Sequence, residues 1–298
     1  MVHHFKCPLC SSEKIILFLE TADHFLSKES FGLFKCSDCG FVFTQDHPDE
    51  AGAGLYYESD EYLSHSETGN GLFKTIYRIF REIMLRRKTS IVRKLSGVEK
   101  GKILDIGSGT GHFLAAMRKA GWEVKGVEIN DKVRKSSISK FGLDILDPGQ
   151  LQTLQAGSFD CITLWHVLEH FNDPISYASE IHRLLKPGGA CIVALPNCSS
   201  YDAEHYGNFW AAYDVPRHLW HFTPETFGMF AEKTGFELTG IRPLPLDVFY
   251  ISVLSERYRG VNLPFITGII NGLWFSILSR FNKERTSSLI YSLRQICP

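Results

Sequence analysis

Two pairs of cysteines near the N-terminus have the spacing of metal ligands. They are Cys7 with Cys10, and Cys36 with Cys39. Structural zinc takes four thiolate or imidazole ligands in a tetrahedron, and each Cys-x-x-Cys turn delivers two of them. A redox-active site of the thioredoxin type uses one such turn, so a redox role is the weaker interpretation. The four cysteines predict a structural zinc ribbon with a role in folding or docking, because four thiolates leave no open position for catalysis.

A glycine-rich turn in the middle of the chain has the pattern of a ligand-binding loop. It follows the apolar segment 102–106 and precedes a helical pattern that starts near Phe113. Its glycines alternate with other residues: Gly107, Gly109 and Gly111. Such a turn lets backbone N–H groups approach a ligand at the N-terminus of a helix. The spacing is GxGxG after Asp105, which differs from the GxGxxG of dinucleotide-binding folds.

A carboxylate at the end of the next predicted strand fits a nucleoside ligand. Glu128 lies at the end of the segment 124–129, seventeen residues beyond Gly111. A carboxylate in this place can accept hydrogen bonds from both hydroxyls of a ribose.

The segments that follow the later strands are rich in histidine, the usual general base near neutral pH. These histidines are His166, His170, His205, His218 and His221. We single out His166, just past the predicted strand 158–165, and His218, in a long segment after the fifth strand. His170 has an alternative role in fixing the turn before the next helix. Further candidates for the rim of the site are Tyr213, Asp214, Arg217 and Trp220.

Strands and helices must alternate to position these groups. After the segments above, the chain continues with strand patterns at 191–195, 237–241 and 288–293. The ordered motifs SFD, LWHVLEH, LLKPGG, LPN and YDVPRHLWHFTPETF lie between 158 and 227. Together with the glycine-rich turn, they resemble the ubiquinone-methyltransferase-like group of class I S-adenosylmethionine (SAM) methyltransferases. The resemblance spans about residues 100–240.

The resemblance implies an α/β fold and a set of cofactor contacts. The fold is a Rossmann-like, doubly wound sheet of seven strands, the last of them antiparallel. Asp105 would anchor the glycine loop and the ammonium of the methionine moiety, and Glu128 would hold the ribose. His166 would face the sulfonium and its methyl group. Gly149 lies in the adenine-contacting segment 146–150, which is a residue or so shorter than in relatives.

Two flanking regions extend the cofactor and acceptor sites. The segment around Tyr62 resembles a cap in which a tyrosine covers the cofactor. The segment 72–95 has the pattern of an amphipathic helix, with eight basic residues and one acidic residue. It could meet an anionic substrate or lipid, or it could be the ordinary helix before the first strand of the sheet.

The chain divides into three predicted parts. Residues 1–48 form the zinc ribbon, residues 49–98 the cap segment and basic helix, and residues 99–298 the methyltransferase domain. Apolar residues at helical spacing predict a helical insert at about 247–281, which would roof the acceptor site. Its apolar surface suits a hydrophobic or lipid-linked acceptor, a homodimer interface or plain packing of a lid.

Charge and composition limit the partners and the compartment. The net charge is -1, but residues 1–60 carry ten acidic and four basic residues, a net of -6. Phosphate binding requires clustered lysine and arginine, so the charge of this segment disfavours a nucleic-acid partner. The sequence shows no secretory signal and no unbroken apolar run of membrane-spanning length. We therefore expect a cytoplasmic protein, monomeric or homodimeric, with membrane contact no more than peripheral.

Three functions are compatible with these features. The first is SAM-dependent O-, N- or C-methylation of a small molecule, such as a sugar-nucleotide, polysaccharide or lipid-linked precursor. The second is methylation of ribosomal RNA, because some relatives join a zinc finger to this fold. The third is a non-catalytic scaffold that binds SAM.

Overall fold

The computed structural model describes residues 1–57 and 72–296. Its central sheet has the strand order β10-β11-β8-β7-β4-β5-β6. The strands are β4 (Lys102–Ile106), β5 (Glu123–Val127), β6 (Ile145–Leu146), β7 (Phe159–Trp165), β8 (Leu185–Pro196), β10 (Phe236–Pro243) and β11 (Ser288–Gln295). β11 runs antiparallel to both of its neighbours, and the other pairs are parallel. The predicted seven-stranded sheet with an antiparallel last strand is confirmed.

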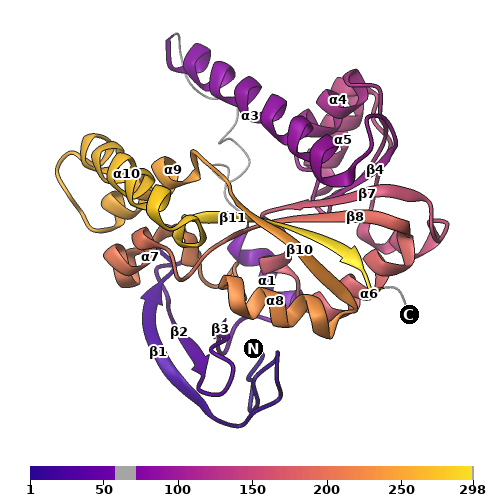
Figure 1. The fold of residues 1–298 in the computed structure, drawn as a ribbon. Helices are drawn as coiled ribbons and strands as arrows, with labels where there is room; N and C mark the ends of the chain where they lie inside the picture. The colour runs from indigo at the N-terminus through magenta and orange to yellow at the C-terminus, as the bar shows by residue number, and fades with distance from the viewer. Residues whose placement is uncertain (58–71, 297–298) are drawn as a thin grey trace.

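Helices cover both faces of this sheet (Figure 1). One layer contains α3 (Leu72–Ser96), α4 (His112–Lys119) and α5 (Asp131–Phe141), and the other contains α6 (Pro174–Leu184) and α8 (Pro224–Lys233). Their ends follow from local sequence. The Asn130 side chain caps α5 by accepting from the Val133 N–H, and α6 and α8 both begin with proline after a capping Asp173 or Thr223.

A second, smaller sheet joins the N-terminal segment to the catalytic part of the chain. It consists of β1 (Ile15–Ala22), β2 (Ser30–Cys36), β3 (Val42–Thr44) and β9 (Trp220–His221) in that order. β9 belongs to the segment that carries His218, and it pairs with β3 through Val42 and Phe43. The division of the chain at residues 48 and 98 stays a prediction, and the pairing shows that the first and third parts share one sheet.

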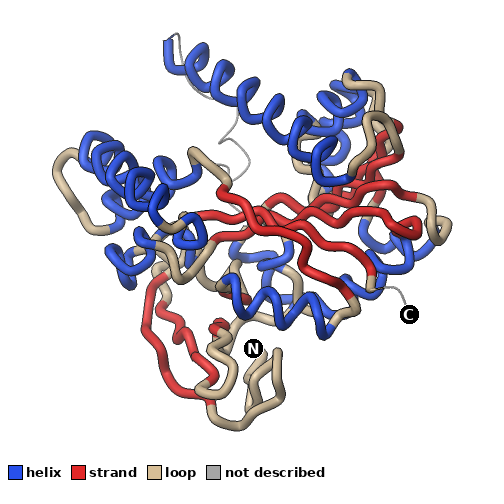
Figure 2. Tube along the Cα trace, in the orientation of Figure 1, coloured by secondary structure: helices blue, strands red, loops and turns tan. Residues whose placement is uncertain are grey.

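A helical hairpin stands between β10 and β11, as the sequence predicts. It consists of α9 (Asp247–Tyr258) and α10 (Pro264–Phe281), which lie side by side at one end of the molecule (Figure 2). Gly268 and Gly272 permit the close approach of the two helices. A Cβ at Gly268 would lie 2.5 Å from the Val253 Cα, and one at Gly272 would lie 2.7 Å from the Phe249 ring.

Short helices complete the described part of the chain. They are α1 (Glu50–Ala53), α7 (Tyr201–Tyr206), η1 (Gly54–Tyr56), η2 (Pro148–Thr153), η3 (Leu168–His170), η4 (Gly207–Phe209), η5 (Ala211–Tyr213) and η6 (Lys283–Arg285). None of the helices in residues 1–57 and 72–296 has the length and apolarity needed to cross a membrane.

Candidate functional site

The glycine loop lies between β4 and α4. The structure explains why each of its three positions is a glycine. All three have positive φ, a region that favours glycine. A Cβ at Gly107 would come within 2.4 Å of Val167, and one at Gly111 within 2.8 Å of Leu143. Gly109 has nothing within 4 Å of its Cβ position, so its side of the loop is open. The outer glycines therefore pack the loop tightly, and Gly109 leaves room for a ligand.

The two predicted cofactor carboxylates lie at this loop. Glu128 directly follows β5, and its Oε2 accepts a hydrogen bond of 2.8 Å from the Gly109 N–H. Its Oε1 accepts from the Asn130 N–H at 2.8 Å, and each oxygen keeps a lone pair for a further donor. Asp105 is buried in β4, where its Oδ1 accepts a 2.6 Å hydrogen bond from the Thr163 hydroxyl. Burial raises the pKa of Asp105 to about 7.

These residues fit the nucleoside and methionine parts of SAM. Glu128 can accept from ribose hydroxyls at the carboxyl ends of the strands, where ligands of such sheets bind. Ile129, next to it, is 77% exposed. A large apolar side chain left bare beside this carboxylate offers a surface for an adenine ring. Ile129 is not among the predicted site residues, although an apolar residue directly after a carboxylate at a strand end is a usable signal.

The other two predicted cofactor residues are less directly placed. Gly149 lies in η2, where its N–H donates to the Asp147 carboxylate at 3.0 Å. Arg134 links this turn to Glu128, since it contacts Asp147 Oδ2 at 3.1 Å and donates to the Glu128 carbonyl at 2.6 Å. The contact of Gly149 with SAM stays a prediction. Tyr62 lies outside the described residues.

His166 and His218 come together around one buried carboxylate. Glu169, in η3, has its Oε1 3.6 Å from His166 Nδ1 and 4.0 Å from His218 Nε2. Neither oxygen of Glu169 has a hydrogen-bond partner among the described residues. His166 has a φ of 57°, a strained value for a residue other than glycine, and its Nε2 lies 2.9 Å from Asp247 Oδ2. Strain of this kind at the end of β7 is typical of functional sites.

The surroundings of His166 favour its charged form. Burial acts to lower the pKa of His166, but the hydrogen bond to Asp247 and the nearby Glu169 carboxylate outweigh it and raise the pKa to about 9. His166 is therefore an imidazolium at neutral pH. Burial would also raise the pKa of Glu169, yet His166 and the neighbouring histidines hold it at about 2. The result is a buried ion pair of Glu169 with His166, which faces His218.

His218 and His170 are fixed in one tautomer each. The Nδ1–H of His218 donates to the Ala212 carbonyl at 2.8 Å, and the Nδ1–H of His170 donates to the Arg217 carbonyl at 3.0 Å. The Nε2 lone pair of each imidazole is then available. Burial is the main cause that lowers the pKa of His170 to about 4. His218 Nε2 is therefore placed to accept a proton beside Glu169.

Glu169, His170 and His218 also have the composition of a cation site, with one ligand atom from each within 4.8 Å of the others. The His166 imidazolium, however, already supplies the counter-charge for Glu169. We therefore interpret this group, with His166, as an acid–base cluster.

Three of the four further rim candidates are buried, and the fourth, Asp214, is half-buried with its Oδ2 3.9 Å from His218 Nε2. Tyr213, Arg217 and Trp220 are buried. The Arg217 guanidinium donates to Asp23 of the N-terminal segment at 2.8 Å and to Asp214 at 2.6 Å. These residues hold the segment that carries His218 against the small sheet. They therefore support the site from its protein-facing side.

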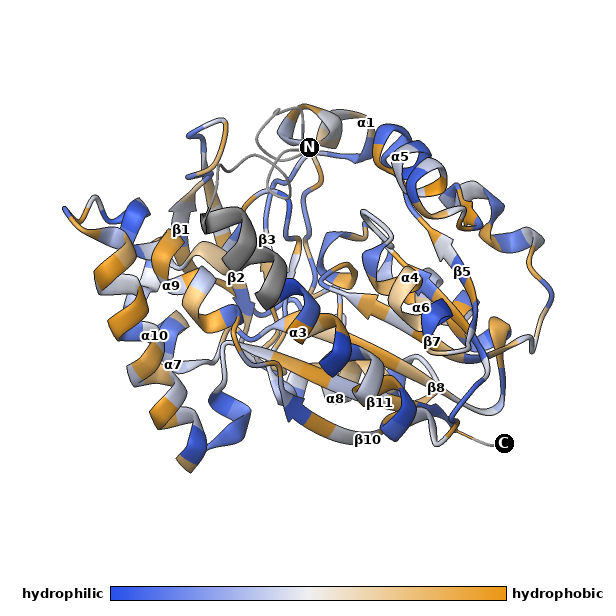
Figure 3. Cartoon of the chain, turned by 90° about the horizontal axis from the view of Figure 1, so that it is seen from above, coloured by the Kyte–Doolittle hydropathy of each residue, from blue (hydrophilic) through white to orange (hydrophobic). Residues whose placement is uncertain are grey.

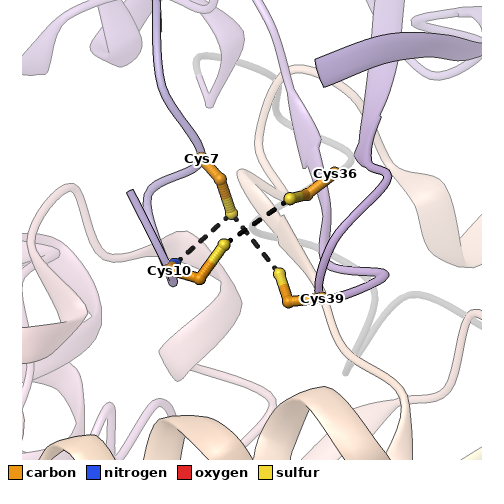
Figure 4. A group of neighbouring side chains, drawn as sticks. All are labelled: Cys7, Cys10, Cys36 and Cys39. Carbon is orange, nitrogen blue, oxygen red and sulfur yellow. Dashed lines mark hydrogen bonds between the residues drawn. The ribbon is translucent and has the colours of Figure 1, made fainter. Parts of the chain in front are cut away.

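The four N-terminal cysteines converge on one point (Figure 4). The Sγ atoms of Cys7 and Cys39 are 3.6 Å apart, as are those of Cys10 and Cys36. A tetrahedron of thiolates about zinc places its sulfurs about 3.8 Å apart, whereas a disulfide needs about 2.05 Å. The two Cys-x-x-Cys turns have a similar backbone. In each, the residue directly after the second cysteine, Ser11 or Gly40, has a positive φ. The site thus fits the tetrahedral zinc that the sequence predicts.

Comparison with known proteins agrees with this geometry. A family model described as a methyltransferase domain matches residues 79–240, which is more than half of the chain. A ubiquinone biosynthesis O-methyltransferase of Thiobacillus denitrificans is 28% identical over 165 residues, covering 50% of this chain and 71% of that protein. One of Psychrobacter arcticus is 29% identical over 110 residues, covering 34% of this chain. The match spans less than half of the Psychrobacter protein, 43% of its length.

The fold has solved counterparts as well. A SAM-dependent methyltransferase from Archaeoglobus fulgidus superposes with a TM-score of 0.50 at 21% identity, covering 76% of this chain and 100% of that one. At this identity the similarity concerns the fold alone. The family match, the strand order and the glycine loop with its two carboxylates agree with one another. The chain therefore belongs to the methyltransferase-domain family and has the fold of the class I SAM-dependent enzymes.

Proposed function

We propose that this protein transfers the methyl group of SAM to a small-molecule acceptor bound beside His166 and His218. One observation carries the proposal. Val167 packs on Gly107 so closely that a Cβ there would lie 2.4 Å away, and His166 is the residue before Val167. The cofactor loop and the acid–base cluster are thus built against each other at the carboxyl ends of β4 and β7.

The residues of this cluster can supply alignment and proton transfer. SAM supplies an electrophilic methyl group that moves to the acceptor by in-line displacement. His218 Nε2, with its tautomer fixed by the Ala212 carbonyl, accepts the proton of an acceptor hydroxyl or amine. Glu169, 4.0 Å away, stabilises the imidazolium that forms. His166, whose two ring nitrogens face Asp247 and Glu169, keeps Glu169 in place beside His218 and so positions the base.

The acceptor class is a further part of the proposal. The relatives are named ubiquinone biosynthesis O-methyltransferases, which favours an oxygen acceptor. The roof of the site begins at Asp247 of α9 and continues into the apolar α10, which suits a lipid-linked or sugar-nucleotide precursor with a hydrophobic part. We also propose that the cysteine cluster holds a structural zinc ion.

The test is a methyl-transfer assay without a chosen acceptor. The full chain is incubated with methyl-labelled SAM and a small-molecule extract, and labelled products are identified by mass spectrometry. We expect a labelled small molecule, and a His218→Asn variant should reduce its rate by about 10²-fold or more while SAM affinity is unchanged. The matched control, His205→Asn, removes an exposed histidine and should keep the rate.

Two outcomes would overturn the proposal. Label that appears in RNA would support the ribosomal RNA alternative, which the acidic N-terminal segment does not favour. SAM bound in stoichiometric amount with no labelled product in any extract would support the scaffold alternative.

A further inference from the structure

The outward face of α10 is a continuous apolar surface. It comprises Phe265, Ile266, Ile270, Leu273, Trp274, Ile277 and Phe281, each between 45% and 86% exposed. In Figure 3 much of the outer side of this helix is coloured as hydrophobic. Contiguous apolar patches of this kind on a soluble domain mark a contact with a protein, a ligand or a membrane.

The packing of the hairpin explains why this face is left over. α10 contacts α9 through Gly268, Gly272 and Phe275, which are its buried residues. The glycines bring α9 close, so a narrow stripe of α10 suffices to hold the helix in place. Asn271 and Leu278 also contact the body of the protein, and the exposed apolar face is the part of α10 that is left facing outward.

The charged side chains near the face are mostly basic, and two of them are paired: Arg259 lies 3.8 Å from Glu256 Oε1, and Arg285 forms an ion pair with Glu204. From Val261 to Asn282 the single charged residue is Arg280, which lies seven positions after Leu273 and so on the same face. Arg257 and Arg259 precede the helix, and Lys283 and Arg285 follow it. Residues 257–285 thus hold five basic residues and one acidic residue, Glu284, a net of +4 in a chain whose total is -1.

Two binding partners are candidates for this face, a second copy of the protein and a lipid surface. The charge pattern favours the lipid surface. In a two-fold symmetric dimer the same patch faces itself, so the basic ends of one α10 would approach those of the other. Like charges opposed in this way disfavour the contact. An anionic bilayer complements both features, since its headgroups attract the arginines and lysine while its acyl boundary accepts the apolar side chains.

We propose that α10 binds the surface of an anionic lipid bilayer through this face, with the helix lying in the interface and not crossing it. The surface is one helix away from the active site, because α9, on which α10 packs, begins at Asp247, the partner of His166. The proposal goes beyond methyl transfer and does not depend on it.

The experiment is co-sedimentation of the full chain with vesicles, without SAM or acceptor. Phosphatidylcholine vesicles with phosphatidylglycerol should bind the protein, and vesicles of phosphatidylcholine alone should bind it at least about tenfold less. Added salt should weaken the binding. The double variants Ile270→Ser with Trp274→Ser, and Arg280→Glu with Lys283→Glu, should each reduce it at least about tenfold.

A matched control distinguishes binding through this face from nonspecific binding of exposed apolar residues to vesicles. Ile16 and Leu17 of β1 are also more than half exposed but lie in the acidic N-terminal segment, and their double serine variant should bind vesicles like the wild type. Unchanged SAM affinity in every variant shows that each is folded. Equal binding to both vesicle types, binding that survives the α10 changes, or a dimer that Ile270→Ser with Trp274→Ser converts to a monomer would overturn the proposal.

Discussion

Asp105 links cofactor binding to pH. Its burial raises its pKa to about 7, so the carboxyl group is largely protonated below that pH in the free protein. A cationic ligand group favours the ionised form and releases the proton on binding. If Asp105 meets the ammonium of SAM, the Kd for SAM should fall by about tenfold per pH unit between about pH 5 and 7, and level off above.

Calorimetry in buffers of different ionisation enthalpy checks this prediction, since it measures the released proton directly. The variant Asp105→Asn should bind more weakly and lose the pH dependence. A pH dependence that persists in this variant would assign the titration to another group.

The charge of His166 makes the folding stability depend on pH. Its folded pKa of about 9 lies above the unfolded value of about 6.5, because Asp247 and Glu169 favour its charged form. The stabilisation is therefore complete below about pH 6.5 and is lost as pH rises through about 9. The variant Asp247→Asn should lower Tm at pH 6 by more than it does at pH 10.

Thermal unfolding at both pH values measures this difference. Asp131→Asn provides a control, because Asp131 is an exposed carboxylate paired with Lys135 on α5, away from His166. An equal loss of Tm at both pH values in Asp247→Asn would show that Asp247 supports α9 without acting through the charge of His166.

At the scale of elements, the hairpin of α9 and α10 depends on two glycines. A methyl group at Gly268 would meet the Val253 backbone at 2.5 Å, and backbone cannot move as cheaply as a flexible side chain. We expect Gly268→Ala to cost about 1–3 kcal/mol of unfolding free energy. Gly228 in α8 is the matched control, because its Cβ position has an ordinary 3.8 Å contact. Gly228→Ala should stabilise the protein by about 0.5–1 kcal/mol.

Denaturant unfolding of both variants tests the pair of expectations. A Gly268→Ala variant as stable as the Gly228→Ala variant would show that the two helices separate readily, and that the apolar face of α10 is not held in place by α9.

Local sequence patterns account for the elements that could be predicted. The predicted strands β4, β5, β7, β8, β10 and β11 contain apolar runs bounded by glycine, proline or polar residues, and the helices between them have apolar residues at helical spacing. The metal site and the cofactor loop could be predicted because their residues lie in short turns of the chain. The two Cys-x-x-Cys turns supply the metal ligands, and one glycine-rich turn forms the loop.

The parts that escaped prediction depend on contacts between distant segments. β9 has two residues and pairs with β3 about 180 positions earlier in the chain, so no local pattern identifies it. Arg217 looks like a rim residue in the sequence but forms an ion pair with Asp23, which buries it. The charge of His166 likewise depends on Asp247, which its own segment does not contain.

For the whole molecule, these long-range contacts make the N-terminal segment a support for the active site. The Thr44 hydroxyl, at the end of β3, donates a 2.7 Å hydrogen bond to the His218 carbonyl and lies 3.0 Å from His221 Nε2. The cysteine cluster holds Cys36 at the end of β2 and Cys39 shortly before β3. A metal ion there would fix the strand on which the position of His218 depends.

Removal of that metal should therefore separate cofactor binding from catalysis. After chelation, or in Cys36→Ser, we expect weaker β3–β9 pairing, a lower Tm and a turnover reduced at least about tenfold, since small displacements of a catalytic group are costly. SAM affinity should change little, because the residues that fit SAM lie on β4, β5 and the loops that follow them.

Metal analysis, thermal unfolding and the labelled-SAM assay measure the three effects. Cys198→Ser, outside the cluster, should leave all three as in the wild type. If turnover survives the loss of the metal, the small sheet holds His218 through β9 and the ion pair of Arg217 with Asp23 alone, and the cluster serves a purpose outside this site.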